Sequence, residues 1–160
     1  MRRIALVFGA AALAAALLAA TALPATTGPA TVKTRKTKLG RVLVGPSGHT
    51  LYLFAKDKRG KSSCAGVCAD AWRPLITRGA PKALRGAKAS KLGTTRRAGG
   101  QLQVTYAGHP LYAFAEDTRA GTTKGEGVSA FGAKWFAVSA SGRKVRRHAA
   151  PPPVSPYPPY

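Results

Sequence analysis

Ten residues of this chain occur twice almost unchanged: Gly48-His49-Thr50-Leu51-Tyr52-Leu53-Phe54-Ala55-Lys56-Asp57 returns sixty residues later as Gly108-His109-Pro110-Leu111-Tyr112-Ala113-Phe114-Ala115-Glu116-Asp117. Seven of the ten positions are identical, and the alignment needs no gap. A segment that recurs at a fixed spacing is one supersecondary unit used twice. We therefore expect two tandem repeats, over residues 39–91 and 92–145. A functional site would be made twice or would lie where the copies meet.

Strand signals surround both copies. Residues 41–44 lead through a turn-forming Gly-Pro-Ser-Gly cluster into residues 50–54, which is typical of a β-hairpin with a four-residue loop. In the second copy, residues 101–106 precede a turn at Ala107-Gly108, and residues 110–114 follow it. Each repeat is therefore expected to contain one β-hairpin.

The spacing of apolar residues predicts which strands are central. Leu102, Val104 and Tyr106 alternate with polar residues and share one face of their strand. In the second strand of each copy, both faces are apolar or aromatic, as with Leu51 and Tyr52. Strands of this kind are buried on both sides, so we expect these two to lie in the middle of the fold.

The remaining segments complete a mainly β fold. The sequence predicts further strands over residues 92–96 and 134–139. It also predicts a short helical turn over residues 64–72 and a basic connector with a short helix over residues 81–91. We expect two tandem β-hairpin-containing repeats that pack with pseudo-twofold symmetry into one small β domain over residues 39–145.

The two ends of the chain differ from this domain. Two arginines precede an apolar, alanine-rich run that ends at Ala20-Thr21-Ala22, which is typical of a cleaved signal peptide over residues 1–22. An uncleaved membrane anchor is the alternative. Residues 23–38 are polar and basic and predict a flexible linker. Residues 146–160 predict a disordered, proline-rich tail.

The net charge of the chain limits the kinds of molecule that it is expected to bind. The chain has 26 Lys and Arg against 5 Asp and Glu, a formal net charge of +21. For an exported protein, the acidic neighbours are cell-wall polymers, phospholipid headgroups or acidic polysaccharides. Much of the charge lies in two flanks, residues 33–38 and 143–147. We expect no sequence-specific nucleic-acid reader, since none of the usual binding motifs occurs.

The pattern Leu-Tyr-x-Phe-x-x-Asp, present twice, is followed after the first copy by Cys-x-x-x-Cys-Ala-x-x-Trp. Over residues 40–143 the chain thereby resembles the bacterial "secreted repeat of unknown function" family, described as predicted lipoproteins with a conserved Yx(F/W/Y)xxD motif. The resemblance implies a secreted repeat protein and no established activity. The chain departs from the family in lacking a cysteine after the signal, so we expect no lipobox. It also departs at Arg73, where proline is common.

Cys64 and Cys68 are the only two cysteines. In an exported protein, two cysteines this close are expected to be oxidised together, and the bond would hold a local turn. The alternatives are an envelope copper site, in which soft thiolates select Cu(I) with help from a histidine such as His49 or His109, and a redox-active dithiol.

The repeated polar and aromatic residues each have a structural and a functional interpretation. Asp57 and Asp117 follow a strand, so they are expected to secure the turn after it, although a carboxylate pair could also be catalytic or bind metal. His49 and His109 start the second strand of each copy, where exposed polar residues are ordinary. The aromatic residues are expected to form core rather than a ligand cage. These are Tyr52, Phe54, Trp72, Tyr112, Phe114 and Trp135.

No nucleophile elbow, phosphate loop or zinc-protease motif occurs, and the three histidines and five acids suggest no catalytic set. The sequence thus predicts a secreted, non-enzymatic module of the cell envelope or extracellular space, without a cofactor. We expect its basic flanks to hold it near anionic surfaces. The alternative is an envelope copper-binding or thiol redox protein that uses Cys64, Cys68 and a histidine.

Overall fold

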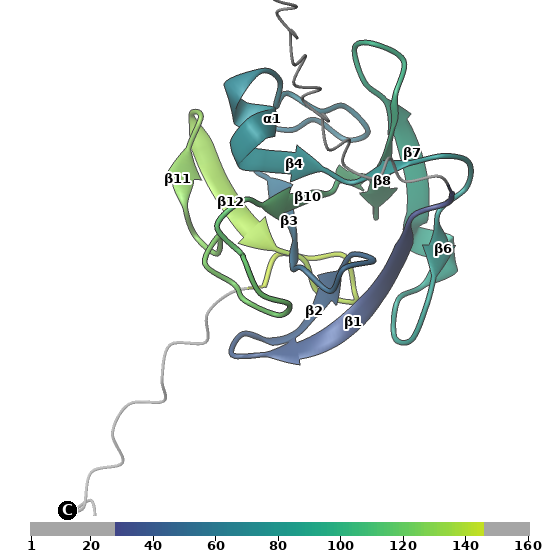
Figure 1. The fold of residues 1–160 in the computed structure, drawn as a ribbon, viewed down its shortest axis with the longest axis vertical. Coiled ribbons are helices and arrows are strands. Elements are labelled where there is room, and N and C mark those ends of the chain that lie inside the picture. Colours follow the sequence, from purple (N-terminus) through teal and green to yellow (C-terminus); the bar gives the residue numbers. More distant parts are fainter. Residues whose placement is uncertain (1–27, 146–160) are drawn as a thin grey trace, which may run out of the picture.

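The computed structural model describes residues 28–145, and most of its regular structure is β (Figure 1). The predicted signal peptide and the predicted proline-rich tail lie outside the described residues. In chain order the elements are β1 Thr31–Thr37, β2 Gly40–Val44, β3 Leu51–Phe54, α1 Val67–Ala71, β4 Trp72–Pro74, β5 Ile76–Thr77, β6 Lys82–Ala83, the 3-10 turn η1 Ala89–Lys91, β7 Leu92–Arg96, β8 Leu102–Tyr106, β9 His109–Pro110, β10 Tyr112–Phe114, β11 Ser129–Ala130 and β12 Ala133–Ala137.

The central sheet interleaves the two repeats. Its strand order is β11-β12-β3-β10-β4. Strand β3 of the first repeat pairs with β12 of the second, and β10 of the second pairs with β4 of the first, all antiparallel. The two repeated strands meet in the middle, where Tyr52 lies opposite Tyr112. Each repeat therefore completes the sheet of the other.

Equivalent residues occupy equivalent places in this sheet. Phe54 lies opposite Trp135, and Phe114 lies opposite Trp72. The loops after the strands exchange backbone hydrogen bonds in the same way, from Gly121 N to Gly48 O at 3.0 Å and from Gly60 N to Gly108 O at 2.9 Å. These reciprocal contacts support the predicted pseudo-twofold packing, which stays a prediction.

Strand β3 separates two hydrophobic clusters, as its two apolar faces predicted. Tyr52 and Phe54 point into a cluster that contains both tryptophans. Leu51 and Leu53 point into the other, with Val104 and Tyr106 of β8. All four residues of β3 are at most 2% exposed. The neighbours of β3 therefore bury both of its faces.

The first strand corrects the expected linker. The sequence pattern predicts a flexible segment over residues 23–38, but residues 31–37 form β1, which pairs with β6 over residues 31–32 and with β2 over residues 33–37. Val32 and Thr34 face inward at 0% and 7% exposure. The alternating basic residues face outward and hide this pattern. The folded part thus begins before residue 39.

The two expected hairpins differ. In the first copy, β2 and β3 share only the bridge between Val44 and Thr50, because β2 pairs with β1 instead. In the second copy, β8 and β9 form a short hairpin whose turn residues Ala107 and Gly108 have φ of 51° and 81°. Positive φ at both central positions is the type I′ geometry that suits the twist of paired strands.

The shorter segments follow the sequence pattern in part. Helix α1 lies within the helical turn expected over residues 64–72, and β7 coincides with the strand expected at 92–96. The basic connector over 81–91 contains strand β6 and the turn η1 in place of a single short helix. Between residues 28 and 145, no helix has the length and apolar character needed to cross a bilayer.

Candidate functional site

The repeated motif builds a stack of four aromatic rings. Trp72 and Trp135 stack face to face, with ring centroids 3.9 Å apart and planes 3° apart. Phe54 stacks on the outer face of Trp135 at 4.1 Å, and Phe114 stacks on that of Trp72 at 4.2 Å. Each tryptophan is therefore covered by the phenylalanine of the other repeat.

The two tyrosines of the motif close the edges of this stack. Tyr52 lies edge-on to Trp72 at 5.4 Å, and Tyr112 lies edge-on to Trp135 at 5.2 Å. Both tyrosines and Trp135 are 0% exposed, and Trp72 is 1% exposed. A ligand cage would need an open ring face, whereas stacked and edge-on pairs of this kind fill a core.

The phenol of each tyrosine donates a hydrogen bond to the aspartate of the other repeat. Tyr52 Oη lies 2.6 Å from Asp117 Oδ2, and Tyr112 Oη lies 2.7 Å from Asp57 Oδ2. The second carboxylate oxygen accepts backbone N–H groups, from Ser63 to Asp57 and from Lys124 to Asp117. Each aspartate thus joins its own exit loop to the core strand of its partner repeat.

The two tyrosine–aspartate pairs have different surroundings. Tyr112 Oη also lies 2.7 Å from Ser62 Oγ, which accepts a bond from the Arg97 guanidinium at 2.9 Å. The same guanidinium donates to Gln103 Oε1 and to the backbone carbonyl of Cys64. Tyr52 Oη instead accepts the backbone N–H of Gly125 at 3.3 Å. Among the described residues, side-chain hydrogen bonds therefore link the Tyr112–Asp57 pair, and not the Tyr52–Asp117 pair, to the segment that holds the cysteines.

Burial decides the protonation of both phenols. Burial raises the pKa of Tyr52 far above its ordinary value, and the hydrogen bond to Asp117 raises it further. The pKa of Tyr112 is raised mainly by burial, and Asp57 raises it while the bond to Ser62 opposes the rise. Both phenols stay neutral and donate to a carboxylate. They cannot serve as bases near neutral pH, since a general base needs a pKa close to the working pH.

Cys64 and Cys68 form a disulfide, with Cα atoms 5.3 Å apart. The bond joins Cys64, which precedes α1, to Cys68 in the first turn of that helix, and the two cysteines are 1% and 5% exposed, packed in the cluster of the tryptophans. It leaves no thiolate for the copper site that the sequence offers as an alternative. Among residues 28–145, no three His, Cys, Asp or Glu side chains gather as metal ligands.

The two repeated histidines are in different environments. His109 lies half-buried in the turn into β9 and lines an open groove of about 1430 Å³. Burial lowers its pKa, the cations Arg59 and Lys144 lower it further, and Asp57 opposes them. His49 is not among the residues that line this groove, so the structure does not join the two histidines there.

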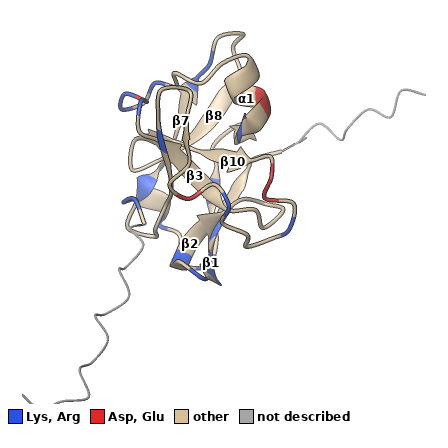
Figure 2. Cartoon of the chain, turned by 90° about the vertical axis from the view of Figure 1, so that its left-hand side faces the viewer, with Lys and Arg blue, Asp and Glu red and all other residues tan. Residues whose placement is uncertain are grey.

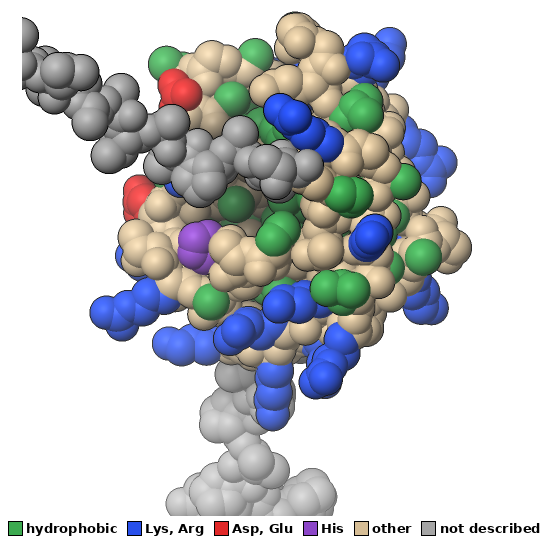
Figure 3. Space-filling view, turned by 45° about the vertical axis from the view of Figure 1, so that its right-hand side comes forward, with side chains coloured by type: hydrophobic (Ala, Val, Ile, Leu, Met, Phe, Trp, Pro, Cys, Tyr) green, Lys and Arg blue, Asp and Glu red, His purple; other side chains and the backbone are tan. Residues whose placement is uncertain are grey.

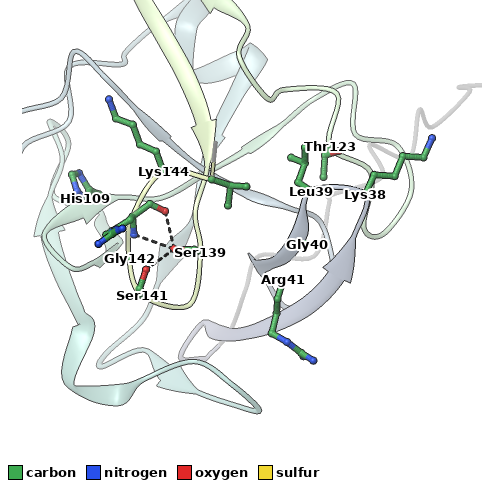
Figure 4. Close-up of a pocket in the computed structure, with 12 residues that line it drawn as sticks. Lys38, Leu39, Gly40, Arg41, His109, Thr123, Ser139, Ser141, Gly142 and Lys144 are labelled. Carbon is green, nitrogen blue, oxygen red and sulfur yellow. Dashed lines mark hydrogen bonds between the residues drawn. The ribbon is translucent and has the colours of Figure 1, made fainter. Parts of the chain in front are cut away.

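The groove is lined by basic, hydroxyl and backbone groups from four parts of the chain (Figure 4). One wall is the turn between β1 and β2, and the other is the segment that follows β12. His109 and Thr123 come from two further loops. Its lining residues are Lys38, Leu39, Gly40, Arg41, His109, Thr123, Ser139, Ser141, Gly142, Arg143, Lys144 and Val145.

The structure thus brings together the expected aromatic residues and both aspartates, but in crossed pairs that the sequence did not predict. Sequence reasoning also missed the polar partners Gln103, which is buried, and Ser62 and Arg97, which are partly buried. By alternation Gln103 belongs to the polar face of its strand, yet it is 0% exposed and donates to the Leu111 carbonyl at 2.8 Å. A polar residue in a strand carries no local sign that both faces are covered.

Comparison with known proteins agrees with this arrangement of repeats. A model of the family described as "Secreted repeat of unknown function" matches residues 33–76 and residues 93–139. The first match runs from β1 to β5, and the second runs from β7 to just beyond β12. No curated protein and no solved structure gives a significant match. Because two copies of the family's repeat cover more than half of its 160 residues, the chain belongs to the secreted repeat family of unknown function.

Proposed function

We propose that this protein is a non-enzymatic module of the cell envelope or extracellular space that binds anionic surfaces through its basic flanks. Its family is described as secreted. The observation that carries the proposal is the separation of charge: most of the basic side chains are exposed, while three of the five carboxylates accept hydrogen bonds within the fold.

Three of the five acidic residues have structural partners. Asp117 and Glu126 are 1% and 7% exposed. Asp57 and Asp117 accept the tyrosine hydrogen bonds, and Glu126 Oε2 accepts the backbone N–H of Ala137 at 2.7 Å. Among the described residues, only Asp70 and Glu116 are exposed carboxylates. The outer surface therefore has an even larger excess of positive charge than the composition indicates.

The basic residues are spread over loops and strand edges, and many lie at the β1–β2 end of the molecule (Figure 2). In the space-filling view, Lys and Arg line the lower edge of the face and also lie at its upper right and right side, while the visible acidic side chains lie along its left side (Figure 3). A field of one sign over a surface attracts polyanions at long range and weakens with salt.

The interior chemistry supports the non-enzymatic part of the proposal. The motif residues are buried in ring stacks, both phenols are held neutral, and the cysteines are paired in a disulfide. A catalytic set needs a nucleophile or base that reaches a substrate. The motif residues that the two repeats share therefore stabilise the fold, and we assign binding to the outer surface.

A binding assay tests this proposal directly. The exported, mature protein is mixed with isolated cell-wall polymer and with vesicles that contain or lack anionic lipid, at about 0.05 M and 0.5 M salt. We expect binding to anionic material only, with most of it lost at the higher salt. Binding that survives high salt unchanged, or that is equal on neutral vesicles, contradicts the proposal.

Export is tested separately. We propose that residues 1–22 are removed as a signal peptide. Intact mass and N-terminal sequencing of the protein recovered outside the cytoplasm are expected to show a chain that starts near residue 23. A full-length N-terminus in a membrane fraction would instead support the uncleaved anchor.

A further inference from the structure

We propose that the groove between the β1–β2 turn and the segment after β12 binds one strand of an extended polyanion, a flexible polymer with regularly spaced phosphate or carboxylate groups. This inference rests on the proposed function and names the site and the class of ligand. It differs from a general attraction of charges because it assigns binding to one place.

The first argument is that the fold brings together two basic segments, residues 38–41 and residues 139–145. They are about a hundred residues apart in the sequence, yet Leu43 N donates to Val138 O at 2.7 Å, and Val42 forms a bridge with Ser139. Lys144 folds back to form a bridge with Val138. The β1–β2 turn and the segment after β12 therefore become opposite walls of one groove.

The second argument is the charge of the lining. One wall contributes Lys38 and Arg41, and the other contributes Arg143 and Lys144. No acidic residue is among the described residues that line the groove. All four basic side chains are exposed. Without a ligand, Lys144 Nζ lies over the Phe136 ring, 4.5 Å from its centre, and the ends of Lys38 and Arg41 point away from the opposite wall (Figure 4). These long, exposed side chains can turn toward an anion between the walls, whose charge would offset the repulsion among them.

The third argument is hydrogen-bonding capacity. Guanidinium groups bind phosphate and carboxylate oxygens in pairs, and hydroxyl groups add further donors. Thr123, Ser139 and Ser141 supply hydroxyls to the groove. Ser139 Oγ lies 2.8 Å from Ser141 Oγ and also bonds the backbone N and O of Arg143. The Ser139 side chain thereby holds the backbone of Arg143 in position; its bond with Ser141 is drawn in Figure 4.

The shape favours a polymer strand over a membrane. The site is concave and open, with a volume of about 1430 Å³, which is larger than a typical small-molecule pocket of about 300–1,000 Å³. A flat layer of lipid headgroups would contact protruding residues and would not reach Ser139 or Thr123 on the lining. A single flexible chain can enter between the two walls and meet cations on both.

His109 gives the site a dependence on pH. The groups that act on its imidazole are Arg59, Lys144 and Asp57, and the two cations disfavour its charged form. Burial is the largest cause of the lowered pKa of His109, and a bound anion would offset the two cations and raise that pKa. By linkage, the polymer should bind more tightly as the pH falls below the ordinary histidine pKa.

The test compares two matched quadruple variants of the mature protein. The groove variant is K38Q/R41Q/R143Q/K144Q. The control is K61Q/R78Q/R85Q/K88Q, which removes the same charge from four exposed residues that do not line the groove. Inorganic polyphosphate, polygalacturonate and vesicles containing phosphatidylglycerol serve as probes by calorimetry or co-sedimentation. As a control for folding, a cooperative thermal unfolding transition is required of both variants.

We expect the groove variant to bind the two soluble polymers at least about tenfold more weakly, and the control to lose less than about threefold, because localised contacts outweigh distant charge. Polyphosphate and polygalacturonate distinguish phosphate from carboxylate ligands. H109Q should abolish the gain in affinity between pH 8 and pH 5.5, and the His109 imidazole signal in NMR should report a raised pKa when polymer is added.

The outcomes separate this inference from the proposed function. An equal loss of polymer affinity in the two variants would contradict binding at the groove, while the proposed general binding to anionic surfaces would stand. A wild-type protein that binds no anionic probe would overturn both. Binding to vesicles with no binding to either soluble polymer would overturn the assignment of a polymer strand.

Discussion

At the scale of single residues, the tyrosine hydroxyls explain why the motif uses tyrosine beside phenylalanine. Tyr52 and Phe54 lie on the same face of β3, and both pack on the tryptophan pair. Only the tyrosine donates to a carboxylate, at 2.6 Å in the case of Asp117. A buried carboxylate without a donor is costly, so Tyr and Asp are needed together, each from a different repeat.

Removal of either partner should therefore destabilise the fold. We expect Tyr52→Phe to lower the free energy of unfolding by about 1–3 kcal/mol, because Asp117 and the Gly125 N–H lose a buried partner. In a double-mutant cycle with Asp117→Asn, measured by urea unfolding, the combined loss should be smaller than the sum. Additive losses within about 0.5 kcal/mol would show that the pair does not interact.

The raised pKa of both phenols predicts an alkaline loss of stability. In the unfolded chain, tyrosine ionises near pH 10, whereas the buried phenols stay neutral well above it. The advantage of the neutral form is complete below pH 10 and is lost as the pH rises beyond that. Relative to Tyr52→Phe/Tyr112→Phe, wild-type stability should fall by about 1.4 kcal/mol per tyrosine per pH unit above 10. Parallel stability profiles of the two proteins between pH 8 and pH 11 would contradict this expectation.

Gly125 lies against the ring stack without room for a side chain. A Cβ at this position would lie 2.8 Å from Trp72 Cη2 and 2.9 Å from Tyr52 Cζ. We expect Gly125→Ala to cost about 1–3 kcal/mol in urea unfolding through overpacking. Gly28→Ala is the control, because a Cβ there meets nothing within 4 Å. Equal stability of the two variants would contradict this packing.

At the scale of elements, the segment from Cys64 to Trp72 connects the polar and aromatic parts of the core. Helix α1 leads directly into β4, and the Cys64 carbonyl accepts a bond from Arg97 at 2.7 Å. Only the first repeat has this short helix and disulfide. The second repeat reaches Trp135 through a glycine-rich loop and the β11–β12 pair. Different local structures therefore deliver equivalent tryptophans to one stack.

The disulfide should stabilise this segment modestly. Because the closed loop is short, we expect Cys64→Ser/Cys68→Ser to lose about 2 kcal/mol in urea unfolding. Alkylation and intact mass of the exported protein, without reductant, should show no free thiols. Two free thiols with one tightly bound Cu(I) per chain would favour the copper alternative.

At the scale of the whole molecule, each repeat depends on the other for its sheet and core. The central tyrosine–aspartate bonds join residues 65 and 55 positions apart. The strands β3 and β10 each pair with the tryptophan strand of the opposite repeat. A chain cut between the repeats would leave each half with an open sheet edge and an uncovered tryptophan.

We therefore expect residues 28–91 and residues 92–145 not to fold separately. Each fragment alone should show no cooperative thermal transition by circular dichroism, and mixing the two should restore one. A fragment that dimerises with itself would still agree with exchange between repeats. A folded monomer of residues 28–91 would contradict it.

Local patterns predicted much of the fold and little of the site. The duplication, the strands near 92–96 and 134–139, and the helical turn before Trp72 could be read from turn residues and alternation. Strand β1 could not, because its outward Lys and Arg resemble a charged linker. The roles of Gln103 and Arg97 could not be predicted either. Their polar side chains suggest an exposed position, and only the tertiary structure shows the partners that hold Gln103 in the interior and Arg97 partly buried beside it.

The sequence by itself determined that this is a basic protein made of two β repeats of a family described as secreted, because charge and duplication are local or additive properties of the chain. Tertiary structure alone decided that the repeats exchange their Tyr–Asp bonds and tryptophan strands, and that the β1–β2 turn and the segment after β12 face each other across one groove. These features depend on pairings between residues 38 to 97 positions apart. Their energy arises only after the chain has closed long loops and excluded water from the core.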